Sequence, residues 1–188
     1  MRGAKATPPR CAPDPDLRIP FEGGALRPWR KDDADALVRH ADDREVWRNL
    51  GDRFPHPYTP KDARKWLAGG FEAGNELSLA LELAGEAAGG IGLKFWSDPI
   101  FRITAEVGYW LGRERWGEGV MTRAIGAFVP WAFGRFDLLR IEAGVFETNP
   151  ASARVLEKAG FALEARLARS VIKDGQVLDR LLYVRFRE

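Results

Sequence analysis

Two glycines separated by one residue, Gly117 and Gly119, stand directly before a stretch with the apolar spacing of an amphipathic helix. The first N–H groups of a helix have no partner within it and point the same way as the positive end of the helix dipole, so such a start attracts anions. Glycine leaves no side chain between a phosphate and the main chain. Arg113, Arg115 and Arg123 are cationic partners nearby. The pattern predicts a phosphate-binding loop.

The glycine pair matches neither of the common nucleotide motifs. Thr122 stands where the third glycine of a dinucleotide-binding G-x-G-x-x-G would be, and the Gly-Lys-Ser/Thr ending of a P-loop is missing. A loop that uses glycine only for tight geometry would give the same letters. On the residues alone, both interpretations stay open.

Glu106 is a candidate general base on the segment before this loop. Residues 105–111 alternate as in a strand, which puts Glu106 and Trp110 on the same face. Trp110 could partly desolvate the carboxylate, and desolvation raises the pKa of a carboxyl group toward the range of a general base. A solvated or salt-bridged glutamate is the alternative.

Ser152 is a candidate polar residue of the site and lies in a short predicted helix. Asn149 is expected to cap this helix and Pro150 to occupy its first position. Ser152 shares the inward face with Val155 and Leu156, so its hydroxyl should point toward whatever that face borders. A serine that satisfies a backbone group in the first turn is the alternative.

Periodicity and turn signals place these residues on a series of strands and helices. Strands are expected near residues 17–19, 25–27, 77–83, 90–95, 105–111, 139–146, 161–171 and 177–186. Helices are expected after Asp32 and Thr59, over 43–50, from Val120 and from Asn149, and hairpin turns at 86–90 and 173–175. This order predicts an α/β (α+β) protein with a mixed sheet and helices on both faces.

Length and composition predict one domain. The chain has 188 residues, enough for one substantial core. Residues 1–16 contain four prolines and are expected to form an extended arm before a single domain over 17–188. A net charge of +2 gives no argument for nucleic acid or membrane binding. The single cysteine, Cys11, and the lack of an apolar leader fit a cytoplasmic protein, and no metal-ligand spacing is found.

Four segments together resemble the GNAT N-acetyltransferase superfamily, in particular its RimJ/RimL-type branch of ribosomal-protein N-terminal acetyltransferases and their relatives. They are LRPWRKDDADAL, DDREVWRNLGDRFPHPYTPKDARKWL, EVGYWLGRERWGEGVMTRAI and RIEAGVFETNPASARVLEKAGF. The resemblance covers nearly the whole chain after Leu17 and rests mainly on the last two segments. It implies a GNAT fold, with a twisted, mostly antiparallel sheet of about seven strands.

The resemblance also implies an acetyl-CoA site. The loop 116–121 would hold the pyrophosphate through main-chain N–H groups, the strand 109–111 would pair with the pantetheine arm, and Asn149 and Ser152 would lie beside the pantetheine and the sulfur. The residues so assigned to CoA are Tyr109, Trp110, Leu111, Arg115, Trp116, Gly117, Glu118, Gly119, Val120, Met121, Thr122, Asn149 and Ser152.

Three residues depart from the branch pattern. Met121 replaces a usually small residue and is expected to crowd the phosphate loop. Arg123 stands where the branch often has an acid and is expected to add positive charge near the phosphates. Leu156 occupies the place of a tyrosine that protonates the leaving thiolate in other branches, so that role would pass to Ser152.

The implied reaction is direct acetyl transfer from acetyl-CoA to a primary amine, with Glu106 or an ordered water accepting the proton. The amine could belong to a protein N-terminus or to a small molecule, and residues 54–58 together with the helix of Trp66 are expected to shape its pocket. Alternatives are another acyl donor such as succinyl-CoA, a non-catalytic CoA-binding sensor favoured by Met121, or a nucleotide-binding module. A homodimer would fit the family.

Overall fold

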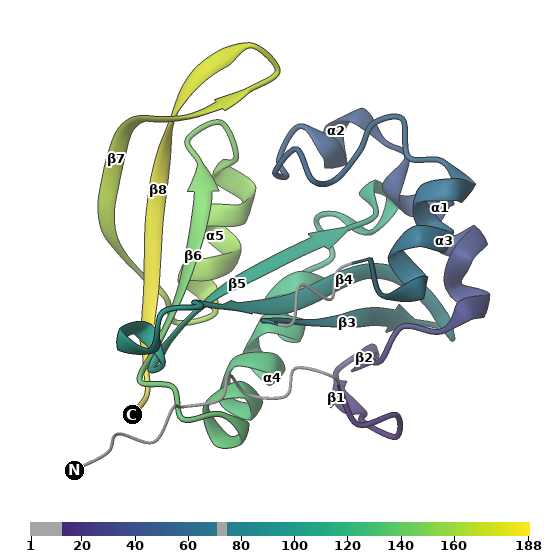
Figure 1. The fold of residues 1–188 in the computed structure, drawn as a ribbon, viewed down its shortest axis with the longest axis horizontal. Coiled ribbons are helices and arrows are strands. Elements are labelled where there is room, and N and C mark those ends of the chain that lie inside the picture. The colour runs from purple at the N-terminus through teal and green to yellow at the C-terminus, as the bar shows by residue number, and fades with distance from the viewer. Residues whose placement is uncertain (1–12, 71–74) are drawn as a thin grey trace.

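The computed structural model describes residues 13–70 and 75–188, and within them the chain forms an eight-stranded sheet in the order β1-β2-β3-β4-β5-β6-β8-β7 (Figure 1). The strands are β1 (Ile19–Phe21), β2 (Gly24–Arg27), β3 (Glu76–Leu83), β4 (Glu86–Phe95), β5 (Thr104–Leu111), β6 (Arg140–Phe146), β7 (Ala162–Lys173) and β8 (Gln176–Phe186). Neighbouring strands are antiparallel except β5 and β6, which are parallel.

Helices connect the strands. They are α1 (Ala34–Ala41), α2 (Arg44–Trp47), α3 (Pro60–Lys65), α4 (Val120–Arg135) and α5 (Pro150–Lys158), with short turns η1 (Lys31–Asp33), η2 (Trp66–Gly70), η3 (Pro99–Phe101) and η4 (Arg113–Arg115). The predicted mixed, mostly antiparallel sheet with helices on both faces is confirmed, with eight strands instead of about seven. Residues 1–12 of the expected arm lie outside the described residues. Within these residues, no helix combines the length and apolar character needed to cross a membrane.

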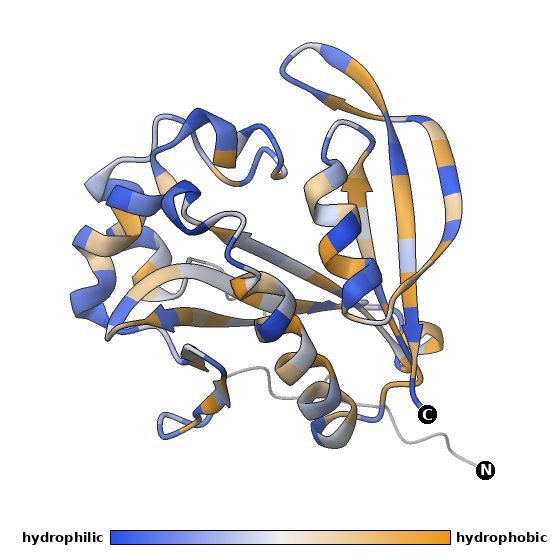
Figure 2. Ribbon diagram, turned by 180° about the vertical axis from the view of Figure 1, so that it is seen from behind, coloured by the Kyte–Doolittle hydropathy of each residue, from blue (hydrophilic) through white to orange (hydrophobic). Residues whose placement is uncertain are grey.

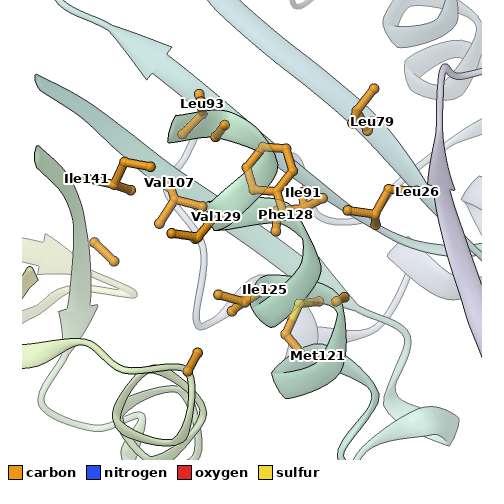
Figure 3. Packing of buried hydrophobic residues seen from close by; sticks show 14 of the residues in the cluster. Leu26, Leu79, Ile91, Leu93, Val107, Met121, Ile125, Phe128, Val129 and Ile141 are labelled. Carbon is orange, nitrogen blue, oxygen red and sulfur yellow. The ribbon is translucent and has the colours of Figure 1, made fainter. Parts of the chain in front are cut away.

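Two cores lie on opposite faces of the sheet. The larger one packs α4 and α5 against the strands, with Phe128 and Leu156 fully buried (Figure 3). The smaller one lies under α1 and α3 around Leu37 and includes Trp110 at its edge. Val107 belongs to the large core, three residues from Trp110 along β5, as the alternating faces of a strand require.

The β3–β4 hairpin turns earlier than predicted. Its turn is at Ala84 and Gly85, both with positive φ, and residues 86–90 belong to β4. The glycine-rich pattern marks a close contact instead of a turn. A Cβ at Gly90 would lie 2.9 Å from the indole nitrogen of Trp110 and 3.0 Å from the ring of Trp29. Glycine therefore lets two tryptophans pack against the strand.

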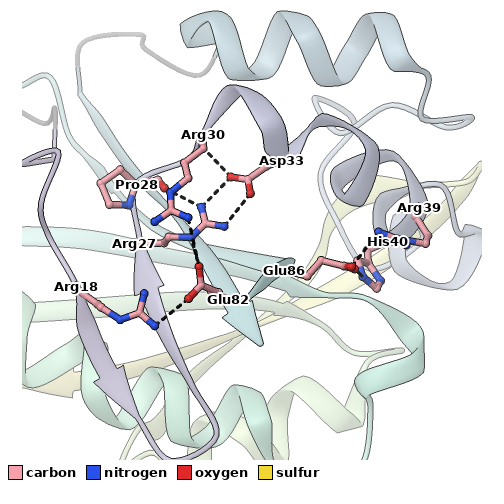
Figure 4. A network of polar contacts seen from close by, with 9 residues as sticks. All are labelled: Arg18, Arg27, Pro28, Arg30, Asp33, Arg39, His40, Glu82 and Glu86. Atoms are coloured by element: carbon pink, nitrogen blue, oxygen red, sulfur yellow. Dashed lines mark hydrogen bonds and ion pairs between the residues drawn. The ribbon is translucent and has the colours of Figure 1, made fainter. Parts of the chain in front are cut away.

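The start of the first helical segment is held by Asp33, and the predicted cap at Asp32 is wrong. The Asp33 carboxylate accepts the main-chain N–H of Arg30 at 2.7 Å and two bonds from the Arg27 guanidinium at 2.7 and 2.8 Å (Figure 4). Arg27 is 3% exposed and also pairs with Glu82 of β3, which holds the pKa of Glu82 below its usual range. This buried network fixes β2, β3 and α1 relative to one another.

The next two helices begin as their sequences predict. The Asp43 carboxylate accepts the N–H groups of Glu45 and Val46 at the start of α2. Thr59 and Asp62 form the expected reciprocal cap of α3, with Pro60 in its first turn. These caps fix the segment between α2 and α3, which forms one wall of the site.

His40, in the last turn of α1, is buried. It is 6% exposed, and its Nε2 lies 2.7 Å from the carboxylate of Glu86 (Figure 4). A Cβ at Gly112 would lie 2.5 Å from the His40 ring, so glycine at the end of β5 makes room for the imidazole. The contact anchors the loop that follows β5 against α1.

The β7–β8 hairpin turns at Asp174 and Gly175, as predicted, and both have positive φ. Apolar and polar residues alternate along it (Figure 2). Its tip reaches the segment around α2. Lys173 Nζ lies 2.8 Å from Asp52 and 3.6 Å from the ring centroid of Trp47, and Arg44 pairs with Asp174 at 2.7 Å. We call these five side chains, from Arg44, Trp47, Asp52, Lys173 and Asp174, the hairpin clasp.

Candidate active site

The site begins where β5 and β6 separate. They pair only from Thr104 opposite Arg140 to Glu106 opposite Glu142. Beyond this point β5 continues over 107–111 and β6 over 143–146 in diverging directions (Figure 1). Among the described residues, β6 gives the open edge of β5 no partner there. Peptide groups need partners, so an extended molecule carrying amides could pair with this edge.

The glycine loop lies at the end of the open strand. Gly117 and Gly119 have φ of 81° and 70°, in the left-handed region that favours glycine. A Cβ at Gly117 would meet nothing within 4 Å, so the main chain is open to an approaching group. Gly119 precedes Val120, the first residue of α4, and no side chain caps that end of the helix. The predicted helix start is confirmed, with its first N–H groups available to an anion.

The three arginines near the loop have different partners. Arg123 donates to the carbonyls of Glu22 at 2.9 Å and Glu118 at 3.0 Å, so it ties the loop to the β1–β2 turn. The guanidinium lies beside the glycine loop, where a Cβ at Gly119 would be 3.1 Å from its Nη1, so the expectation that Arg123 adds positive charge near a phosphate stays a prediction. Arg113 pairs with Asp43 at 3.9 Å, whereas Arg115 lines the cavity described next.

Met121 does not crowd the loop, contrary to expectation. Its side chain is 6% exposed and belongs to the large core, where it lies beneath the first turn of α4 (Figure 3). The helical period explains this, because Val120, Ala124 and Ile125 are buried on the same side. Trp116 folds back along the loop and donates its indole N–H to the Leu111 carbonyl at 2.8 Å.

A cavity of about 1250 Å³ fills the opening between β5 and β6. It brings together nearly all of the residues that the sequence assigned to the site. These are Glu106, Tyr109, Trp110, Leu111, Arg115, Trp116, Gly117, Gly119, Val120, Met121, Thr122, Asn149 and Ser152. Glu118 is not among its lining residues. A second hollow of about 480 Å³, between the ends of β7 and β8, contains none of them.

Ser152 is held by two side chains. The Asn149 side chain accepts the Ser152 main-chain N–H at 3.1 Å, which confirms the predicted cap of α5. The Ser152 hydroxyl lies 2.7 Å from the Tyr109 hydroxyl. Burial raises the pKa of Tyr109 to about 12, and the hydrogen bond to Ser152 opposes this shift only partly. This role of Tyr109 was not predicted from the sequence, although a tyrosine on the apolar face of a strand is a usable signal for a buried hydroxyl pair.

Glu106 is salt-bridged, the alternative that the sequence left open. One carboxylate oxygen accepts from Arg180 of β8 at 2.6 Å. To reach β5, the guanidinium crosses β6 at Gly144, where a Cβ would collide with it. Trp110 packs edge-on against Phe54, with centroids 5.5 Å apart, four residues along the strand from Glu106. Sequence reasoning missed Arg180 because 74 positions separate it from Glu106.

Aromatic side chains form the wall opposite Ser152. Phe54, Tyr58 and Trp66 line the cavity, as the sequence predicted for this segment, and Phe54 contacts Tyr58 with centroids 5.0 Å apart. Burial raises the pKa of Tyr58 above its ordinary value. The hairpin clasp joins this wall to β7 and β8, which contribute Val171 and Arg180 to the cavity. The clasp therefore links the two walls.

Several basic side chains line the cavity from the segments around α4 and α5. Arg115 precedes the glycine loop, and Arg154 and Lys158 are on α5, which packs against α4. Together with the free N–H groups at the start of α4, they suit a ligand that carries several phosphates at one end. The open edge of β5 suits amides in its middle, and Ser152 and Glu106 lie where a reacting group would follow. These features fit coenzyme A.

The fold and the cavity thus define a class of protein: a transferase-like domain with a split sheet that fits an acyl-CoA. The model of the acetyltransferase (GNAT) domain family matches residues 25–162. The chain therefore belongs to the GNAT acetyltransferase family, and it is of the RimJ/RimL type.

Individual relatives agree with this assignment. A probable N-acetyltransferase, YjcK of Bacillus subtilis, is 49% identical over 70 residues, which are 37% of this chain and 38% of YjcK. An uncharacterized N-acetyltransferase, p20 of Bacillus licheniformis, is 27% identical over 161 residues, covering 84% of this chain and 89% of p20. The structure of Mycobacterium smegmatis RimJ in complex with CoA-disulfide has a TM-score of 0.78 and 29% identity, covering 92% of this chain and 88% of RimJ.

Proposed function

We propose that the protein is an acetyl-CoA-dependent N-acetyltransferase that transfers the acetyl group directly to a primary amine. The observation that carries this proposal is the single cavity in which the open edge of β5, the glycine loop, Ser152 and Glu106 meet. The family membership supports acetyl transfer, and the solved complex of a RimJ with a CoA-disulfide supports the cofactor.

In this proposal the main chain binds most of the cofactor. The N–H groups around Gly117 and Gly119 hold the pyrophosphate, and the strand 109–111 pairs with the pantetheine amides. Arg115, Arg154 and Lys158 meet the remaining phosphate charge. Neither Met121 nor Arg123 needs to move for the loop to bind the cofactor, because Met121 is buried and Arg123 is held by two carbonyls.

The reaction then needs a proton acceptor and a way to stabilise the leaving sulfur. An amine attacks only in its neutral form, and Glu106 or a water beside it takes the proton. Arg180 occupies one oxygen of Glu106 and holds the carboxylate in place. As the new N–C bond forms and the C–S bond breaks, the electron pair of the C–S bond goes to sulfur, and the Ser152 hydroxyl donates a hydrogen bond to the resulting thiolate. A main-chain N–H of β5 meets the carbonyl oxygen.

We further propose a protein N-terminal amine as the first acceptor to test, because the RimJ/RimL type comprises ribosomal-protein N-terminal acetyltransferases and their relatives. Small-molecule amines and succinyl-CoA remain the comparison substrates. The argument for a non-catalytic sensor is weakened, because it rested on Met121. The cytoplasm, where CoA esters and ribosomes meet, is the proposed location, and a homodimer is the proposed assembly.

A thermal-shift titration with acetyl-CoA, CoA, succinyl-CoA, ATP and NAD tests the cofactor. A ligand at a hundred times its Kd adds about 2.7 kcal/mol of stability. We expect a shift with the CoA compounds only, followed by release of CoA thiol when peptides with free N-termini are added. A shift with ATP or NAD but not with CoA would contradict the proposal. CoA binding without turnover over a broad amine panel would favour the sensor.

A further inference from the structure

We propose that Tyr109 is a positioning residue, whose hydroxyl aims the Ser152 hydroxyl at the leaving sulfur. This inference rests on the proposed function and assigns a residue that the reaction scheme above does not use. Tyr109 comes from β5 and Ser152 from α5, so the pair connects the open strand to the helix that follows β6. Their hydroxyl oxygens are 2.7 Å apart, and both residues line the cavity.

The surroundings of Tyr109 fix its ring. It lies on the face of β5 that carries Ala105, Val107 and Leu111 and packs against the large core, so little freedom is left to the phenol. Ser152 is fixed through its own main chain by the Asn149 cap. The hydroxyl pair therefore joins two rigid supports, and the torsion of the Ser152 hydroxyl is the freedom that remains.

The direction of the hydrogen bond follows from the chemistry of the two groups. A serine hydroxyl has one hydrogen and two acceptor positions, and a phenol is the stronger acid. The other acceptor near the phenol, the Ser152 carbonyl, is 3.4 Å away, at the long end of the range for a hydrogen bond. Tyr109 therefore donates to the Ser152 oxygen. The Ser152 hydrogen is left free to point into the cavity.

Tyr109 donates this hydrogen bond throughout the neutral pH range. With a pKa of about 12, the Tyr109 phenol keeps its proton throughout the neutral range. A hydrogen bond received by an alcohol also polarises the O–H that the alcohol donates. As the C–S bond breaks, the negative charge on sulfur is met by a Ser152 hydroxyl that is already oriented. No proton has to leave Tyr109 for this effect.

The chain offers a matched control in Tyr183. This residue is 3% exposed on β8, and its hydroxyl donates to Glu157 at 3.0 Å, but it does not line the cavity. Tyr183→Phe thus deletes a buried phenol hydroxyl without touching Ser152. Urea unfolding of both variants would show whether each remains folded.

The decisive measurement is the pKa of the thiol of bound CoA, followed by the ultraviolet absorbance of its thiolate. It requires no acceptor amine and therefore does not depend on finding the substrate. If Tyr109 and Ser152 act as a unit, Tyr109→Phe and Ser152→Ala raise this pKa by similar amounts, and the double variant raises it no further. Tyr183→Phe leaves it unchanged. An unchanged thiol pKa in folded, CoA-binding Tyr109→Phe would overturn the inference.

Kinetics with an accepted amine give the second readout. We expect Tyr109→Phe to lower kcat about tenfold while the KM for acetyl-CoA changes less than about twofold, because the hydrogen bond matters only as sulfur gains charge. A raised KM with an unchanged kcat would show that Tyr109 only shapes the binding surface, which contradicts the proposal. If the unsubstituted protein does not bind CoA, the proposed function itself fails, and the binding titration shows this before any variant is made.

Discussion

The two halves of the cavity are built in different ways. The half that we propose binds the cofactor, called the cofactor half below, consists of residues 109–122 and 149–152, and much of it is main chain: an open strand edge, a glycine loop and the start of a helix. The half that we propose binds the acceptor, called the acceptor half, consists of side chains from distant elements, including Phe54, Glu106 and Arg180, fixed by mutual contacts. A binding site made of main chain therefore depends on a few φ angles, whereas a site made of side chains depends on the assembly of the whole fold.

The largest effect should come from Gly119→Val, which breaks the cofactor half. Its φ of 70° is disfavoured for a β-branched residue, and a Cβ there would lie 3.1 Å from Arg123 Nη1. We expect the acetyl-CoA Kd to rise at least about a hundredfold, about 2.7 kcal/mol, measured by isothermal titration. Gly126→Ala in α4, where a Cβ meets nothing, is the matched control and should bind normally. Normal CoA binding by folded Gly119→Val would disprove the phosphate-loop assignment.

Gly144→Ala should break the acceptor half while leaving the cofactor half intact. The new methyl group would occupy the space of the Arg180 guanidinium and so displace the partner of Glu106. We expect kcat/KM for the amine to fall about tenfold with an unchanged thermal shift by CoA. Steady-state kinetics at saturating acetyl-CoA provide the measurement. If kcat/KM for the amine and the affinity for CoA fell by equal factors, the two halves would not be separable.

Alkaline pH should destabilise both halves, through Tyr58 in one and Tyr109 in the other. Burial raises both pKa values, that of Tyr109 to about 12. The unfolded chain ionises its tyrosines near pH 10, so stability present below pH 10 is lost as pH rises toward the folded-state values. Between pH 9 and pH 11 each tyrosine should account for about 1 kcal/mol of the loss. Urea unfolding of Tyr58→Phe and Tyr109→Phe should show a flatter pH dependence, and an unchanged one would be contrary evidence.

The smallest effect should come from Lys173→Met in the hairpin clasp. Methionine keeps the contact with Trp47 but loses the ion pair with Asp52, whose side chain is 76% exposed and can be solvated. We expect a change of at most about threefold in the amine KM, with peptides affected more than small amines. Arg48→Gln, which removes an exposed ion pair with Glu45 outside the clasp, is the control and should have no effect. A loss of CoA affinity would show that the clasp supports the cofactor half instead.

The sequence predicted the secondary-structure elements of the cofactor half well because their signals are local. Gly119 before Val120, and Asn149 before Pro150, mark helix starts within a few residues, and the structure confirms both. The strand containing Glu106 was also recognised from its alternation alone.

The remaining features depend on distant partners. Arg180 reaches Glu106 only because β8 pairs beside β6 and Gly144 leaves a path between them. Tyr109 meets Ser152 only when α5 is in place. Met121 was expected to crowd the phosphate loop because it belongs to the loop motif, but the helical period directs its side chain into the core.

The open edge of β5 also bears on the tendency of the sheet to aggregate. Strand edges recruit other polypeptides, and this sheet limits that hazard at both borders: β1 has three residues, and β7 carries charges such as Arg166, which pairs with Glu147 and Asp179. The unpaired part of β5 lies inside the sheet, between β4 and the diverging β6. A strand of another protein has no straight approach to it, whereas a slender molecule does. The unpaired edge of β5 is therefore the strand edge that other polypeptides cannot easily reach.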